Sequence, residues 1–207
     1  KLSAVFELLR VKHRIMSLRY RGRQGFQLGP IGFLIVINLI LLIVTSIRPQ
    51  FIFVLGLNPA SFLERPWTII TSMFVHSGFG HIFANMLTLY FFGSYLLSLI
   101  GERKFFIIYF GGGILGGVLY ILLAPPFSIA VGASGAVFAV GGALTVLRPK
   151  LTVFVFPIPV PLPLWMVVIG GFLIMSFSPL IAWQAHLGGL AFGLAAGYLF
   201  KKSRRFY

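Results

Sequence analysis

Long, uninterrupted apolar runs constrain this chain more than any other feature. Several of these runs approach or exceed the roughly 20 residues that a helix needs to cross a bilayer core of about 30 Å. With 58% hydrophobic residues, 10% charged residues and a mean hydropathy of +1.00, the composition excludes a soluble fold. A transmembrane β-barrel is excluded as well, because barrel strands alternate apolar and polar residues, whereas these runs are apolar on every face.

The sequence therefore predicts an all-α polytopic membrane protein with six transmembrane helices. The expected helices cover residues 30–47, 77–100, 104–123, 134–147, 161–177 and 183–200. They make up an expected six-helix transmembrane domain of residues 29–200, between a basic amphipathic N-terminal segment, 1–28, and a basic tail, 201–207. Between the first two helices lies a semi-apolar loop, residues 48–76, which is long enough to lie in the membrane interface and to carry function.

The distribution of Lys and Arg predicts the orientation in the membrane. Of the 17 basic residues, only Arg48 and Arg65 fall outside the cell when the N-terminus is placed in the cytoplasm. This is the positive-inside pattern, and it predicts a multi-pass protein of the cell membrane with both termini in the cytoplasm. The net charge of +14 is then explained by contact with anionic membrane lipids. No basic face is interleaved with stacking aromatic residues, so we expect no nucleic-acid partner.

Several kinds of chemistry are excluded because the residues for them are missing. The chain has no Cys and no Asp, and its carboxylates are Glu7, Glu64 and Glu102. A protease with paired aspartates cannot be built from these residues, and thiolate chemistry is absent. There is no His-Glu-x-x-His zinc motif, and we expect neither a metal nor a cofactor.

The predicted topology brings four polar residues together. The second, fourth and sixth helices all run from outside to inside, and their outer ends carry His81 and Asn85, Ser134, and His186. At about 1.5 Å per helical residue, Ser134 and His186 lie about 21 and 22 Å from the inner charges, so they share one depth. Polar residues inside a membrane are costly, and four at one end of three helices indicate a functional site.

The fourth helix is too short to span a bilayer by itself. We therefore expect the preceding loop, residues 124–133, to dip into the protein. Irregular backbone at membrane depth is tolerated only inside protein or beside water, so a cavity is expected next to Ser134.

These residues have the types that nucleophilic catalysis needs. A serine becomes a nucleophile when a base removes its proton, and His186 is the candidate base for Ser134. Ser134 begins a helix, whose free backbone N–H groups favour a developing oxyanion. His81 and Asn85 are four residues apart on one helix face and can add donors. Because no carboxylate falls nearby, a Ser/His dyad is the economical interpretation.

Small residues at helical spacing would bring the fourth and sixth helices close together. These residues are Gly135, Ala139 and Gly142 on the fourth helix and Gly189, Gly193 and Gly197 on the sixth.

Three separated motifs resemble those of the rhomboid intramembrane serine proteases. They are HSGFGHIFAN at 76–85, GASG at 132–135, and AHLGG at 185–189 followed by Gly193. The resemblance covers about residues 30–200. It implies a rhomboid-like six-helix core that cleaves transmembrane segments of other membrane proteins through an acyl-enzyme.

The resemblance also implies individual roles. Ser134 and His186 would form the catalytic dyad, and His81, Asn85 and the Ser134 backbone N–H would form the oxyanion hole, toward the outer face. The residues with supporting roles would be Gly132, Gly135, Phe138, Gly189, Gly193, His76 and Trp67. Substrates would arrive laterally, near the fifth helix and the loop 177–182 that follows it.

Two positions depart from the family pattern. Trp67 is followed by Thr68, where the family often has Arg, so the anchoring of that loop is open. Phe138 stands where many members have a Tyr that packs on the catalytic His, and because the ring is kept we expect the positioning to survive.

Other interpretations stay open at this stage. Ser134 could be no more than a helix cap. The histidines could do no more than form hydrogen bonds between helices. His76, His81 and His186 could instead bind zinc, although no Cys or acidic residue supports them. A non-catalytic relative that escorts membrane clients is a second possibility, and a small transporter is a third.

Overall fold

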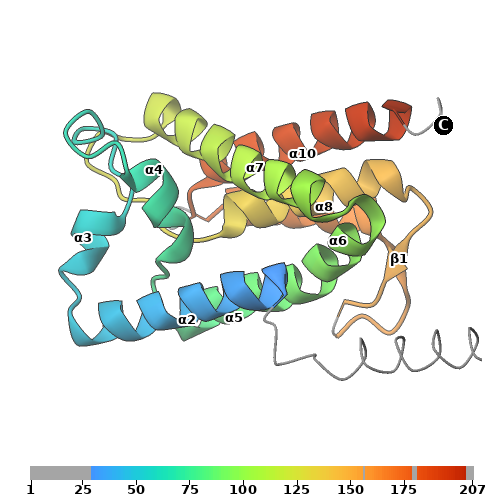
Figure 1. Ribbon diagram of the computed structural model, residues 1–207, viewed down its shortest axis with the longest axis horizontal. Helices are drawn as coiled ribbons and strands as arrows, with labels where there is room; N and C mark the ends of the chain where they lie inside the picture. The colour runs from blue at the N-terminus through green and yellow to red at the C-terminus, as the bar shows by residue number, and fades with distance from the viewer. Residues whose placement is uncertain (1–28, 156, 179–180, 204–207) are drawn as a thin grey trace, which may run out of the picture.

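The computed structural model describes residues 29–155, 157–178 and 181–203, and most of them are helical (Figure 1). The expected N-terminal segment, 1–28, lies outside the described residues, as do residues 204–207 of the expected basic tail.

Helices occupy all six expected ranges. The helices in these ranges are α2 (Pro30–Ile47), α5 (Phe79–Thr88), α6 (Ser94–Ile100), α7 (Glu102–Leu123), α8 (Ser134–Leu147), α9 (Leu164–Ser176) and α10 (Trp183–Ser203). A π-helical turn, η2 (Leu89–Gly93), joins α5 and α6 into one continuous helix of 22 residues.

Among the described residues, three helices are long and apolar enough to cross a membrane: Pro30–Ile47, Phe79–Ile100 and Glu102–Leu123. The helices α8 and α9 are also apolar but shorter, with 14 and 13 residues. The described part of the chain thus has the helical, apolar character of a membrane protein, and six crossings remain a prediction.

The fifth expected helix begins later than predicted, and the fold is not purely helical. The helix α9 starts at Leu164 rather than at residue 161 because residues just before it form a strand, β2 (Leu162–Pro163). This strand pairs antiparallel with β1 (Thr152–Val153). Pro163 has ψ of 133°, an extended conformation that the helix cannot include.

The segment 48–76 is more ordered than a plain loop. It contains α3 (Phe51–Leu55), α4 (Thr68–Thr71) and the 3₁₀ turn η1 (Ser72–Phe74). Three neighbouring carbonyls of α3 accept side-chain donors: Arg65 Nη1 donates to Phe53 O (3.1 Å), Trp67 Nε1 to Val54 O (3.4 Å) and Thr71 Oγ1 to Leu55 O (2.7 Å). Carbonyls at a helix end lack partners within the helix, so these bonds fasten the segment.

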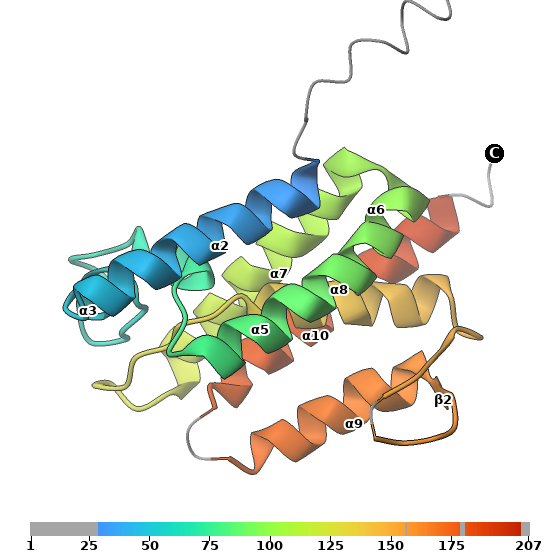
Figure 2. The same ribbon diagram turned by 90° about the horizontal axis from the view of Figure 1, so that it is seen from below.

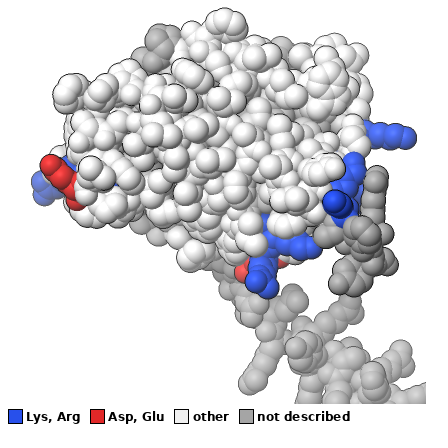
Figure 3. All heavy atoms as spheres, turned by 90° about the horizontal axis from the view of Figure 1, so that it is seen from above, with Lys and Arg blue, Asp and Glu red and all other residues white. Residues whose placement is uncertain are grey.

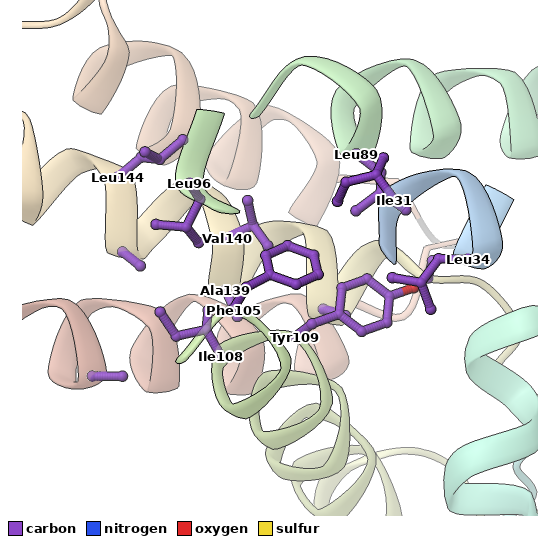
Figure 4. Close-up of a cluster of buried hydrophobic side chains, with 14 of the residues drawn as sticks. Ile31, Leu34, Leu89, Leu96, Phe105, Ile108, Tyr109, Ala139, Val140 and Leu144 are labelled. Carbon is purple, nitrogen blue, oxygen red and sulfur yellow. The ribbon is translucent and has the colours of Figure 1, made fainter. Parts of the chain in front are cut away.

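The helix α8 is the centre of the bundle, and none of its residues is exposed. Figure 4 shows side chains from α2, η2, α6, α7 and α8 meeting in one buried cluster. Its labelled members are Ile31, Leu34, Leu89, Leu96, Phe105, Ile108, Tyr109, Ala139, Val140 and Leu144.

Glycines let α10 lie directly against α8. A Cβ on Gly193 would overlap the backbone of Ala139, and a Cβ on Gly189 would overlap the backbone of Gly135. One turn further, a Cβ on Gly197 would lie 2.9 Å from Cα of Ala143. The small-residue stripes expected from the sequence therefore meet each other, backbone against backbone.

The junction of α6 and α7 and the end of α10 lie toward the same end of the molecule in both ribbon views (Figures 1 and 2). Lys and Arg side chains gather on one side of the face drawn in Figure 3, a smaller group of both signs lies on the opposite side, and uncharged surface separates them. Uncharged surface between charged ends is typical of a protein surrounded by lipid.

Candidate active site

Ser134 and His186 come together at the start of two helices. Ser134 is the first residue of α8, and His186 lies in the first turn of α10. The Ser134 hydroxyl oxygen lies 2.7 Å from Nε2 of His186, within hydrogen-bond distance. Gly189 lies directly against Gly135, the residue that follows Ser134, and this close approach fixes how near the two helices can lie. The packing of α8 against α10 therefore sets the distance between the two side chains.

The ring of His186 is held by apolar surroundings. Only 4% of this residue is exposed, and the Phe138 ring lies 4.6 Å from the imidazole, centre to centre, at 33°. Nδ1 of His186 has no hydrogen-bond partner among the residues that the structure describes. An aromatic ring, rather than a carboxylate, thus orients this histidine, which fits a two-residue arrangement with Ser134.

The backbone before Ser134 is shaped by glycine and tied to the segment 48–76. Gly132 has φ of +122°, a conformation that other residues rarely adopt. Its N–H donates to Ser72 O (2.9 Å), and the N–H of Ala133 points to Nε2 of His76 (3.4 Å). The N–H of Ser134 follows as the first of α8, a position that has no hydrogen-bond partner inside the helix.

His81 lies with one edge of its ring against this backbone. A Cβ on Gly132 would be 2.6 Å from both Cε1 and Nε2 of His81, so this position must be glycine. The opposite ring nitrogen, Nδ1, lies 3.0 Å from the hydroxyl oxygen of Ser77. The ring of His76 packs edge-on against His81, at 4.9 Å between centres.

Asn85 is on the expected helix face, and only 6% of it is exposed. Its amide nitrogen donates to the carbonyl of His81 (2.9 Å). One of the two amide hydrogens is therefore engaged by its own helix, and the second is the donor that a substrate could use.

His76 is buried beside the backbone that leads into α8. Its exposed fraction is 2%, and burial, together with the nearby His81, lowers its pKa to about 4. It is therefore uncharged at neutral pH, and Nε2 can accept the N–H of Ala133. Trp67, which also belongs to the segment 48–76, is half exposed, and its indole N–H donates to the Val54 carbonyl of α3.

A small cavity lies beside Ser134, as the short α8 led us to expect. The centre of a water molecule can occupy about 30 Å³ of this cavity. One water needs roughly 10–15 Å³ by the same measure, so the cavity can hold water. Its walls come from the segment 48–76, the glycines of α7, the loop before α8 and the start of α10. Polar groups of Ser72 and Ser134 border it.

Within the described residues, no group of three or more His, Cys, Asp and Glu side chains is arranged to hold a metal ion. Each of the three histidines has another neighbour: Ala133 for His76, Ser77 for His81 and Ser134 for His186.

The sequence interpretation did not single out two residues that contact the site. Ser77 reaches His81 and Ser72 accepts the N–H of Gly132. The spacing of Ser77, four residues before His81, was a usable signal. Ser72 had none, because it acts through its backbone carbonyl.

Comparison with known proteins identifies the family. The family model described as the rhomboid domain matches residues 63–203. A Bacillus subtilis protein, whose name provisionally calls it a rhomboid protease, is 30% identical over 146 residues, covering 68% of this chain and 71% of that protein. Rhomboid protein 1, mitochondrial, of Saccharomyces cerevisiae is 31% identical over 146 residues, covering 66% of this chain and 42% of the yeast protein.

A third relative shows that the family is not uniform in activity. Inactive RHOMBOID-like protein 8 of Arabidopsis thaliana is 32% identical over 128 residues, covering 59% of this chain and 35% of the plant protein. The chain thus spans less than half the length of its yeast and plant relatives. The domain match covers more than half of this chain and includes the first residues of α5, α8 and α10, so this membrane-embedded protein belongs to the rhomboid family.

Proposed function

We propose that this chain is an intramembrane serine endopeptidase that cleaves transmembrane segments of other membrane proteins. Rhomboid family members are generally intramembrane serine proteases. The observation that carries the proposal here is the 2.7 Å separation between Ser134 Oγ and His186 Nε2, at the start of a helix and beside a cavity. Nucleophile and base within hydrogen-bond reach is the arrangement that activates a serine.

The first half of the reaction forms an acyl-enzyme. His186 Nε2 takes the hydroxyl proton as Ser134 Oγ attacks the carbonyl carbon of the scissile peptide bond. The oxyanion that forms is met by the Ser134 N–H, by Nε2–H of His81 and by the second amide hydrogen of Asn85. His186 then gives its proton to the leaving amine, the C–N bond breaks, and the acyl group stays on Ser134.

The second half restores the enzyme. A water molecule loses a proton to His186 and attacks the ester carbonyl, and the same donors stabilise the second oxyanion. The proton returns to Ser134 as the new carboxyl end of the substrate leaves. Phe138 keeps the imidazole facing Ser134 through both halves.

The orientation and the substrate route follow from the distribution of charge and packing. We place both termini in the cytoplasm, the active site toward the outer face and the protein in the cell membrane, since the inner ends of the helices carry most of the Lys and Arg. Substrate helices arrive laterally beside α9, which has only Leu164 and Val168 buried. We assign residues 29–200 to the protease domain, 1–28 to a cytoplasmic segment and 201–207 to a cytoplasmic tail.

A second candidate is a rhomboid relative that binds membrane clients without cutting them. The Arabidopsis relative that is named inactive makes this a real alternative. It predicts no use for a serine and a histidine at hydrogen-bond distance, whereas this chain keeps that pair.

The deciding experiment combines fluorophosphonate labelling of the purified protein with cleavage of a model transmembrane substrate in proteoliposomes. Ser134→Ala and His186→Ala should each lose labelling and at least ~1000-fold in cleavage rate, while remaining folded. Ser98→Ala is the matched control, because the Ser98 hydroxyl is exposed and donates to the Tyr95 carbonyl. A folded wild type that neither labels nor cleaves would favour client binding, and full activity in either site variant would refute the dyad.

A further inference from the structure

We propose that Ser77 is a positioning residue that fixes the tautomer of His81, so that His81 presents Nε2–H to the oxyanion. This inference rests on the proposed protease function and adds a residue to its machinery. Ser77 reaches the site only through its contact with His81.

The geometry assigns the two edges of the His81 ring to different neighbours. The Nε2 edge faces Gly132, two residues before Ser134, closely enough that a side chain on Gly132 would collide with it. The Nδ1 edge faces Ser77, with 3.0 Å between Nδ1 and the hydroxyl oxygen. His76 closes one side of the ring. Each nitrogen of His81 therefore has one neighbour of its own.

The chemistry of a neutral imidazole makes the Ser77 contact directional. One ring nitrogen carries a hydrogen and the other accepts, and the hydrogen bond of one nitrogen decides the state of the other. A hydroxyl that donates to Nδ1 leaves the hydrogen on Nε2, the nitrogen beside the reacting serine. The reverse tautomer would turn a lone pair toward the oxyanion and repel it.

A capping role does not account for Ser77. The residue that caps α5 is Gly78, and α5 has no side-chain cap hydrogen bond. The Ser77 hydroxyl is thus not used by the end of the helix, although serine is a favoured capping residue. Its described partner is the His81 ring.

The kinetic test compares Ser77→Ala with Ser77→Thr, which keeps the hydroxyl, and with Ser98→Ala, which removes the hydroxyl of an exposed serine in α6. An ordinary hydrogen bond predicts a loss of roughly three- to tenfold in kcat for Ser77→Ala, with KM unchanged. Ser77→Thr and Ser98→Ala should keep the wild-type kcat within about twofold. In a His81→Ala background, Ser77→Ala should have no further effect, because the two residues act as one unit.

A second measurement reads the tautomer without any need for activity. The chain has four histidines, so protein labelled with ¹⁵N-histidine gives a simple nitrogen spectrum, in which loss of signals in His81→Ala assigns His81. Wild type should show a protonated Nε2 and an unprotonated, hydrogen-bonded Nδ1. Ser77→Ala should shift both signals toward a mixture of tautomers.

The two readouts separate failure of this inference from failure of the proposed function. If wild type does not cleave, the protease proposal fails, and the nitrogen spectrum still decides whether Ser77 sets the tautomer. If wild type cleaves, the inference is overturned by a Ser77→Ala variant with wild-type kcat. It is equally overturned by a loss of kcat that leaves the His81 nitrogen signals unchanged.

Discussion

Two neighbours of α8 are packed in opposite ways. On one side, α10 meets α8 through Gly189, Gly193 and Gly197, with backbone against backbone. On the other side, α9 contributes two buried residues, Leu164 and Val168, and most of its large side chains are exposed. Figure 2 shows α9 along one edge of the bundle. Both helices are apolar, so hydrophobicity alone does not decide which one is packed tightly.

Under the proposed function, this difference separates the helices that hold the reacting residues from the helix beside which the substrate would enter. In lipid, helices associate through close packing rather than through a hydrophobic force, and small residues give the closest packing. The interface between α8 and α10 therefore holds Ser134 and His186 at a fixed distance. The helix α9, with Gly170 and Gly171 facing open space, has little that would resist its displacement. If the chain is the proposed protease, we expect motion of α9 to affect substrate binding and to leave the contact between Ser134 and His186 intact.

The largest difference in stability is expected when one glycine of α10 and one glycine of α9 are each changed to alanine. Gly193→Ala should lower the free energy of unfolding by about 2 kcal/mol or more, because the new Cβ overlaps the backbone of Ala139. Gly170→Ala has open space and should be neutral or stabilising by up to about 1 kcal/mol, since alanine favours helix. Unfolding in mixed detergent, followed by tryptophan fluorescence, measures both. Equal changes would mean that the two interfaces are packed alike.

A smaller effect, on kcat, is expected at Phe138 of α8, where side chains of α10 and α9 meet. Phe138 lies between His186 and Phe172, with Phe172 edge-on at 6.2 Å. Phe138→Ala should lower kcat roughly tenfold, a loss of about 1.4 kcal/mol of transition-state stabilisation, because the imidazole loses the ring that orients it. Phe138→Tyr keeps that ring and should retain activity. Phe172→Ala, on α9, should change kcat by no more than about twofold. An equal loss from Phe172→Ala would show that α9 also orients the dyad.

The smallest effect is expected within α9 itself. Val168 lies over Gly141, with a methyl group 3.1 Å from the position of a Cβ there. Val168→Ala should lower the free energy of unfolding by about 1 kcal/mol and raise KM more than it changes kcat. Ile174→Ala, at a side chain that is 74% exposed, should stay within about 0.5 kcal/mol of wild type. If both variants have the same stability, α9 is not fastened by Val168.

Much of the arrangement could be predicted from the sequence. Apolar runs located the helices, and the alternating directions of these helices predicted that Ser134 and His186 share one depth. In the structure, Ser134 Oγ lies 2.7 Å from His186 Nε2. The strands β1 and β2 were missed, because two-residue strands give no periodic signal. The bond from Asn85 to the His81 carbonyl depends on a side-chain rotamer, which residue spacing does not specify.

The anchoring of Trp67 was open at the level of the sequence for a different reason. The residue after it, Thr68, lacks the positive charge that the family pattern offers, so no partner could be named. The structure supplies anchors through Arg65 and Thr71, which bind neighbouring carbonyls of α3. Such bonds join parts of one loop that have no periodic pattern, and only the folded backbone brings the donors and acceptors together.

The central position of α8 has a consequence for the membrane in which the protein works. With 14 residues, α8 is about 21 Å long, shorter than a bilayer core of about 30 Å, and each of its residues is buried or only partly exposed. Hydrophobic mismatch acts on helices through the side chains that touch the acyl chains, so a thinner or thicker bilayer should tilt α2 and α9 and leave α8 in place. The acyl-chain length of the host lipid should then alter KM well before it alters kcat.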